Sequence, residues 1–160
     1  FYVGVMLSYI YQIRMLDRGE YLVWLIFLCS WGCDTCAYCV GKLWGKAFGN
    51  HKMSPKLSPN KSIEGAVGGV AGAFLLTALY AAIFKGQMGI SSQEILILAV
   101  ISAVGGLISM IGDLTASAIK RNYDIKDYGR LIPGHGGILD RFDSMIITAP
   151  IIFYLAFYLM

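Results

Sequence analysis

Charged residues are scarce in this sequence: Asp, Glu, Lys and Arg make up 14% of its 160 residues, while 57% are hydrophobic. Soluble domains carry about 25% charged residues, so an ordinary soluble domain is excluded. The net charge of +3 is too small to indicate a nucleic-acid-binding protein. The composition instead predicts a protein embedded in a lipid bilayer.

The first residues lack the features of a secretory signal peptide. The chain starts with Phe1 inside an apolar run, without an initiator Met, a basic segment or a small-residue cleavage site. We therefore expect residues 1–160 to form a single integral membrane domain that is the C-terminal part of a longer chain.

The apolar runs are continuous and show no strand-like alternation, which argues against a membrane β-barrel. A spanning helix needs about 20 apolar residues, and several runs approach that length. We expect an all-α polytopic membrane helix bundle with about five transmembrane helices, the first of them short or incomplete. The runs are 1–13, 21–44, 65–84, 95–116 and 145–160.

The basic residues are unevenly shared among the connections. If every run spans the membrane, the loops 45–64 and 117–143 lie on one side and carry nine Lys and Arg residues, against three in 14–20 and 85–94. Positively charged loops stay in the cytoplasm, so both long loops are predicted to be cytoplasmic.

Small residues recur at helical spacing within the runs. Glycines four residues apart let two helices approach closely, so helix packing is the predicted role, with ligand contact as the alternative. The four cysteines lie inside one apolar run and are interpreted as small packing residues rather than as a metal site. The glycine pairs are Gly65/Gly69, Gly68/Gly72 and Gly41/Gly45, and the cysteines are Cys29, Cys33, Cys36 and Cys39.

Acidic residues stand at the membrane boundary on both sides of the last long loop. Asp113 lies near the end of one apolar run, and Asp140 and Asp143 stand at the start of the next span. Acids at this depth are costly and usually functional. Three neighbouring carboxylates suggest a Mg²⁺ ion, although the helix dipole also favours an acid at a helix start.

Other polar residues surround these acids. Asp113, Ser117, Lys120 and Arg121 share one face if their segment is helical. The turn Pro133–Gly137 has glycines whose N–H groups suit phosphate oxygens, and its His135 either positions a ligand or caps the turn. Ser58, Lys61 and Ser62 precede a span, where the serines either cap the helix or contact phosphate. The membrane-embedded Asp34, with Tyr38 one turn later, is a candidate accessory acid.

The long loop and its flanks resemble the signature of the phosphatidate cytidylyltransferases, also called CDP-diacylglycerol synthases. The matching pattern is S-x2-K-R-x4-K-D-x5-P-G-H-G-G-x2-D-R-x-D, from Ser117 to Asp143. Two further elements, around Asp34–Gly45 and Ser58–Gly65, are also similar. Asn60 departs from the pattern, because the family more often has a second Lys there.

The resemblance implies transfer of the cytidylyl group from CTP to phosphatidic acid, giving CDP-diacylglycerol and pyrophosphate. It further implies Mg²⁺, a second monovalent cation such as K⁺, a homodimer, and a bacterial inner-membrane location with a cytoplasmic active site. The implied catalytic residues are Asp113, Lys120, Arg121, Asp140 and Arg141; the substrate-binding residues are Ser58, Lys61, Ser117, Lys126, Asp127, His135, Gly136 and Gly137; and the metal ligands are Asp113, Asp140 and Asp143.

Two alternatives remain open at this point. A CTP-dependent polyprenol or dolichol kinase has similar spans and the same nucleotide, and a non-enzymatic transporter would also explain a buried acid and glycine-rich helices. The D-G-x2-A-R core of the CDP-alcohol phosphotransferases is missing, which disfavours that family.

Overall fold

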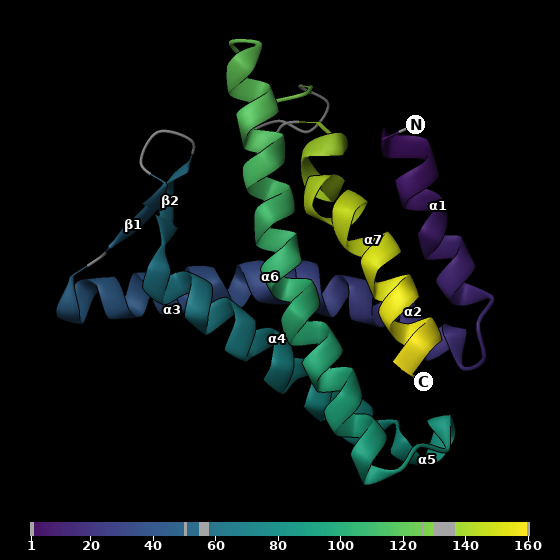
Figure 1. Cartoon of the computed structure of the whole chain (residues 1–160). Coiled ribbons are helices and arrows are strands. Elements are labelled where there is room, and N and C mark those ends of the chain that lie inside the picture. Colours follow the sequence, from purple (N-terminus) through teal and green to yellow (C-terminus); the bar gives the residue numbers. More distant parts are fainter. Residues whose placement is uncertain (1, 50, 55–57, 126, 130–136, 160) are drawn as a thin grey trace.

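The chain is almost entirely helical in the computed structural model, which describes residues 2–49, 51–54, 58–125, 127–129 and 137–159. Four helices in these residues are long and apolar enough to cross a membrane. The predicted all-α polytopic bundle is therefore confirmed (Figure 1). The four candidate spans are Gly19–Gly45, Ile63–Ile83, Ser92–Asn122 and Leu139–Leu159.

The first apolar run forms α1 (Tyr2–Arg14), a helix of 13 residues that packs beside α7 (Leu139–Leu159). The hydroxyl groups of Tyr9 and Tyr154 lie 3.1 Å apart, and the ring of Tyr9 also contacts Phe153. A 13-residue helix is shorter than the bilayer core requires, and α1 is not among the four candidate spans.

The second span is one continuous rod of three segments, α2 (Gly19–Phe27), η1 (Leu28–Gly32) and α3 (Cys33–Phe48). The rod crosses behind α4, α6 and α7 in Figure 1 and extends beyond them at the α3 end. The segment η1 is a single π-helical turn, and such turns are frequent at functional sites. The extra residue of a π-turn changes which side chains of α3 face the neighbouring helices.

A β-hairpin, which the sequence did not predict, occupies much of the loop 45–64. Its strands β1 (Lys52–Ser54) and β2 (Ser58–Ser62) are antiparallel, and β2 leads directly into α4 (Ile63–Ile83). Ser62 is the N-cap of α4, because its hydroxyl accepts a hydrogen bond of 3.1 Å from the N–H of Gly65. The Glu64 carboxylate accepts the backbone N–H of His51 and lies 2.5 Å from its ring Nδ1.

Close packing of α4 on α3 confirms the predicted role of the glycines. A methyl group added to Gly69 would stand 2.8 Å from the Cys33 carbonyl oxygen, and one added to Gly72 would overlap the Cys36 side chain. Cys29 and Cys33 are fully buried, and all four cysteines are free thiols. Cys29, Cys33 and Cys36 therefore act as packing residues, as expected, whereas Cys39 is exposed.

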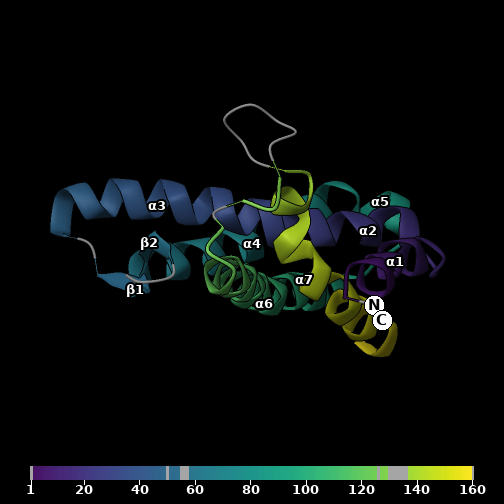
Figure 2. The same ribbon diagram turned by 90° about the horizontal axis from the view of Figure 1, so that it is seen from above.

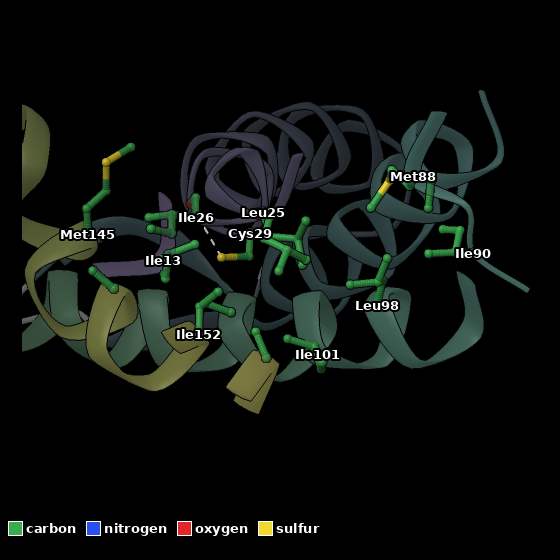
Figure 3. Packing of buried hydrophobic residues seen from close by; sticks show 14 residues of the cluster. Ile13, Leu25, Ile26, Cys29, Met88, Ile90, Leu98, Ile101, Met145 and Ile152 are labelled. Atoms are coloured by element: carbon green, nitrogen blue, oxygen red, sulfur yellow. Dashed lines mark hydrogen bonds between the residues drawn. The ribbon is translucent and has the colours of Figure 1, made fainter. Parts of the chain in front are cut away.

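The apolar core lies where α1, the α2 and η1 segments of the rod, α6 (Ser92–Asn122) and α7 meet (Figure 3). Ile13, Leu25, Ile26 and Ile152 are completely shielded there. The short α5 (Lys85–Met88) adds Met88 at one end of this core. The core fixes how the rod lies against α6 and α7, the helices that carry Asp113, Asp140 and Asp143.

The connections gather at two opposite ends of the bundle. At one end Arg18 pairs with Glu94 at 3.0 Å and also donates to the Gly89 carbonyl, which joins two of the predicted short loops. The hairpin and the C-terminal end of α6 lie toward the opposite end (Figures 1 and 2). This arrangement agrees with the predicted alternation of the loops.

Candidate functional site

A cavity of about 580 Å³ lies between α3, the hairpin, the start of α4 and the middle of α6. Its size is that of a small-molecule site. The lining is partly apolar, with small side chains along the α3–α4 contact that leave room for a ligand. The polar and charged residues on its wall are Asp34, Tyr38, Lys42, Lys52, Ser58, Lys61, Ser62 and Asp113.

An ion pair between Lys61 and Asp113 forms one wall of this cavity. The Lys61 ammonium nitrogen is shielded from solvent. Among the described residues, Asp113 is its one polar partner. An ammonium group has three N–H donors, so one carboxylate does not satisfy it. The unused donors point to an acceptor-rich ligand in the cavity, and a phosphate is such a group.

A second charged cluster lies between α6 and α7. The buried Lys120 ammonium is 3.0 Å from Asp140 Oδ1 and 3.4 Å from Asp143 Oδ2. Asp140 and Asp143 are three residues apart at the start of α7, so they share one face of the helix and both reach the same lysine. Lys120 thus neutralises an acid pair that would otherwise repel.

Asp140 also forms hydrogen bonds with the backbone of the loop that connects α6 and α7. Its Oδ2 accepts the backbone N–H groups of Tyr128 and Gly137, each at 2.9 Å. The Tyr128 ring lies 5.1 Å from the Lys120 ammonium, and its hydroxyl donates to the Ala116 carbonyl. Burial raises the pKa of the Tyr128 phenol above its ordinary value. The Gly137 N–H group, which the sequence assigned to phosphate oxygens, therefore donates to the Asp140 carboxylate in this structure.

The two clusters adjoin each other at the crossing of α6 and α7. Asp34 lies close enough to Asp113 and Asp143 for electrostatic repulsion between their negative charges. Asp113 and Asp143 repel each other as well. Asp34 therefore belongs to the same acidic region, as the sequence suggested for an accessory acid. The acidic region thus draws on three helices, with Lys61 paired to Asp113 and Lys120 paired to Asp140 and Asp143.

The predicted helical face on α6 is only partly correct. The segment is helical through Asn122, but Asp113 faces the cavity and Lys120 is buried toward α7. Arg121 is exposed and donates to the Ile125 carbonyl. Asp113 and Lys120 are seven residues apart, so they lie on nearly the same side of the helix but about 10 Å apart along its axis, and each therefore contacts a different neighbour.

The remaining predicted residues have different surroundings. Ser117 is half-buried on α6, Asp127 is exposed, and Arg141 is exposed with its carbonyl accepting from Trp31 Nε1 at 3.1 Å. The predictions for Lys126, His135 and Gly136 lie outside the described residues.

Sequence reasoning did not assign Lys42 and Lys52 to the site. Lys42 continues the α3 face of Asp34 and Tyr38 at intervals of four residues, and it donates to the Tyr38 hydroxyl at 3.3 Å. That spacing was a usable signal. Lys52 lies on β1, so its position at the cavity depends on a hairpin that the sequence of this loop did not predict.

Comparison with known proteins gives a consistent picture. Residues 1–159 match the model of the cytidylyltransferase family. Proteins named phosphatidate cytidylyltransferase from Bacillus subtilis, Rickettsia felis and Staphylococcus saprophyticus are 39%, 38% and 41% identical over 96%, 96% and 94% of this chain. The aligned part covers 54%, 66% and 54% of those relatives, so the chain spans roughly half to two thirds of their length.

Proposed function

The chain belongs to the cytidylyltransferase family, and on that premise we propose that it transfers the cytidylyl group of CTP to phosphatidic acid. The products are CDP-diacylglycerol and pyrophosphate. The observation that carries this proposal is the shielded Lys61 ammonium, paired with Asp113 on the wall of a cavity large enough for a ligand. The names of the relatives add the lipid substrate.

The reaction asks little of a general base. The second pKa of a phosphate monoester is about 6, so phosphatidate is largely an anionic nucleophile at neutral pH. Its oxygen attacks the α-phosphorus of CTP, and the bond to the β-phosphate oxygen breaks to release pyrophosphate. The main tasks are to bring two anions together and to stabilise the leaving group. Lys42, Lys52 and Lys61 on the cavity wall suit both tasks.

Mg²⁺ remains a proposal, with Asp113 and Asp143 as its first protein ligands and Asp140 as the third predicted one. The described residues contain no group of three Asp, Glu, His or Cys side chains poised for a metal. Proteins commonly hold Mg²⁺ through one or two carboxylates plus substrate phosphates, and the two acids at the α6–α7 crossing fit that pattern. When bound, the ion would neutralise charge on the phosphates. A second cation such as K⁺ stays a prediction.

We also propose a bacterial inner-membrane location with the cavity open to the cytoplasm. The uneven division of basic residues between the two sets of loops and the bacterial relatives support this orientation. The homodimer implied by the resemblance stays a prediction, which native mass spectrometry of the detergent-solubilised protein tests.

Labelled CTP tests the reaction directly. The full chain, purified in detergent, is incubated with phosphatidic acid, Mg²⁺ and CTP labelled at either the α- or the γ-phosphate. Label from the α position in the lipid, together with release of pyrophosphate, supports cytidylyl transfer. Label from the γ position in the lipid would instead establish a lipid kinase, and absence of both would leave transport as the alternative.

A further inference from the structure

Three serine hydroxyl groups meet inside the bundle, each from a different helical segment. Ser30 of η1 lies 2.6 Å from Ser144 of α7, and Ser109 of α6 donates to Ser30 at 3.3 Å. Their exposed fractions are 0%, 3% and 0%, so this serine triad is shielded from both water and lipid. Hydrogen-bonded hydroxyl groups in such surroundings hold their helices in one relative position.

Each serine of the triad lies within about one helical turn of one acid of the site along the sequence. Ser30 precedes Asp34 by four residues, and Ser109 precedes Asp113 by four, so in each case the acid lies about one helical turn further along. Ser144 directly follows Asp143, and its backbone N–H donates to Asp143 Oδ1 at 2.8 Å. The three acids that interact electrostatically thus stand on three helices that the serines connect.

The crossing of α6 and α7 makes this connection tight. A methyl group added to Gly112 would be in van der Waals contact with the Ser144 carbonyl oxygen at 3.4 Å, so α6 and α7 approach closely there. Asp113 and Asp143 are the chain neighbours of Gly112 and Ser144. The separation of the two carboxylates therefore depends on how α7 sits against α6 at this point, where Ser30 also binds Ser144.

We propose that Ser30, Ser109 and Ser144 are positioning residues that set the spacing of the acids Asp34, Asp113 and Asp143. This inference rests on the proposed function for its catalytic consequence. The π-helical turn η1 contributes to this positioning, because Ser30 lies within it. Loss of the triad would let the helices shift slightly, and small misplacements of reacting groups cost up to about 100-fold in rate.

The chain contains a matched control for these variants. Thr77 of α4 donates to Ser102 of α6 at 2.7 Å, and both residues are fully buried. This hydroxyl pair also joins two helices, but neither residue lines the cavity or neighbours one of the acids in sequence. The control double variant Thr77→Val/Ser102→Ala should therefore lower stability without disturbing the spacing of the acids.

The test compares the double variant Ser30→Ala/Ser144→Ala with this control in the full chain reconstituted in lipid. Melting temperature, kcat, the KM for CTP and the half-saturating Mg²⁺ concentration are measured for both. We expect similar losses of melting temperature, but a fall in kcat of about tenfold or more and a raised Mg²⁺ requirement only in the serine variant. Equal kinetics for the two variants would overturn the proposal.

A readout without substrates separates this inference from the proposed function. Asp143→Asn is introduced into the wild type, the serine variant and the control, and the melting temperatures are compared. The effects should be non-additive with the serine variant and additive with the control, because Ser144 adjoins Asp143 whereas Thr77 and Ser102 do not. Additivity in both backgrounds would refute the positioning role, whereas non-additivity in a protein that makes no CDP-diacylglycerol would refute only the proposed function.

Discussion

Asp113 is the residue that links the cavity to the acids at the crossing of α6 and α7. It pairs with Lys61 on the cavity wall, and it is close enough to Asp34 and Asp143 to repel both. A group in this position influences both the ligand and the other acids. Its role depends on charge, which a neutral side chain of the same shape removes.

Asp113→Asn should reduce CDP-diacylglycerol formation by at least about 100-fold, because the neutral amide neither balances Lys61 nor supplies an anionic ligand. Turnover with labelled CTP measures the loss, and the melting temperature establishes that the variant is folded. The control is Asp124→Asn, an exposed acid just beyond α6 whose left-handed backbone tolerates Asn. Substantial activity in Asp113→Asn would remove this acid from the reaction.

Lys120 has a structural task that its place in the signature did not reveal. It is buried between Asp140 and Asp143, and these acids depend on it for neutralisation. Removal of one partner from a buried ion pair typically costs about 3–5 kcal/mol, because the remaining charge is left without compensation.

Lys120→Met should therefore lower the stability of the protein by an amount in this range, visible as a clear fall in melting temperature. Lys85→Met is the matched control, since Lys85 is exposed and donates only to the Ser92 hydroxyl among the contacts described. Its expected change is within about 0.5 kcal/mol. Similar melting temperatures for both variants would contradict the structural role of Lys120.

At the scale of elements, the contact between α3 and α4 forms the inner wall of the cavity. The glycines of α4 lie against the backbone and small side chains of α3, while Gly41 of α3 faces Gly65 and the Ser62 hydroxyl. Each residue that keeps the helices close also sets the width of the cavity. Larger side chains at this contact should disturb both packing and binding.

Gly69→Val should sharply reduce the yield of monodisperse protein or its melting temperature, because the added carbons collide with the Cys33 carbonyl. The control is Gly4→Val on α1, where an added Cβ meets nothing within 4 Å. Size-exclusion chromatography in detergent and thermal unfolding measure both effects. A wild-type melting temperature for Gly69→Val would show that α3 and α4 are less tightly packed than described.

At the scale of the whole molecule, the loops sort to two ends as the charge distribution predicted. Arg18 and Glu94 mark one end, and the hairpin with the end of α6 marks the other. A single polypeptide that follows the positive-inside rule should therefore expose α5 and the end of α6 on opposite membrane faces.

Cysteine labelling tests this orientation. In a background with Cys36 and Cys39 replaced by Ala, Gly86→Cys should react with an impermeant maleimide added to intact spheroplasts. Asn122→Cys should react only after permeabilisation, because its end of α6 is predicted to be cytoplasmic. Both positions are exposed, so access depends on the membrane side. The reverse labelling pattern would invert the proposed topology.

The sequence by itself determined the class of fold, the approximate spans, the glycine contacts and the family resemblance. These properties follow from local composition and spacing: continuous apolar runs must form helices in lipid, and small residues four apart form a packing stripe. The family signature likewise lies within contiguous segments, which is why Asp113, Asp140 and Asp143 were identifiable before their surroundings were known.

Only the tertiary structure decided which charges meet. It paired Lys61 with Asp113 and Lys120 with Asp140 and Asp143, added Lys42 and Lys52 to the cavity, and joined Ser30, Ser109 and Ser144 in the interior. These contacts connect residues up to 114 positions apart and depend on helix crossings, a π-helical turn and a hairpin. Such geometry arises from packing between elements, which the pattern within any one segment does not specify.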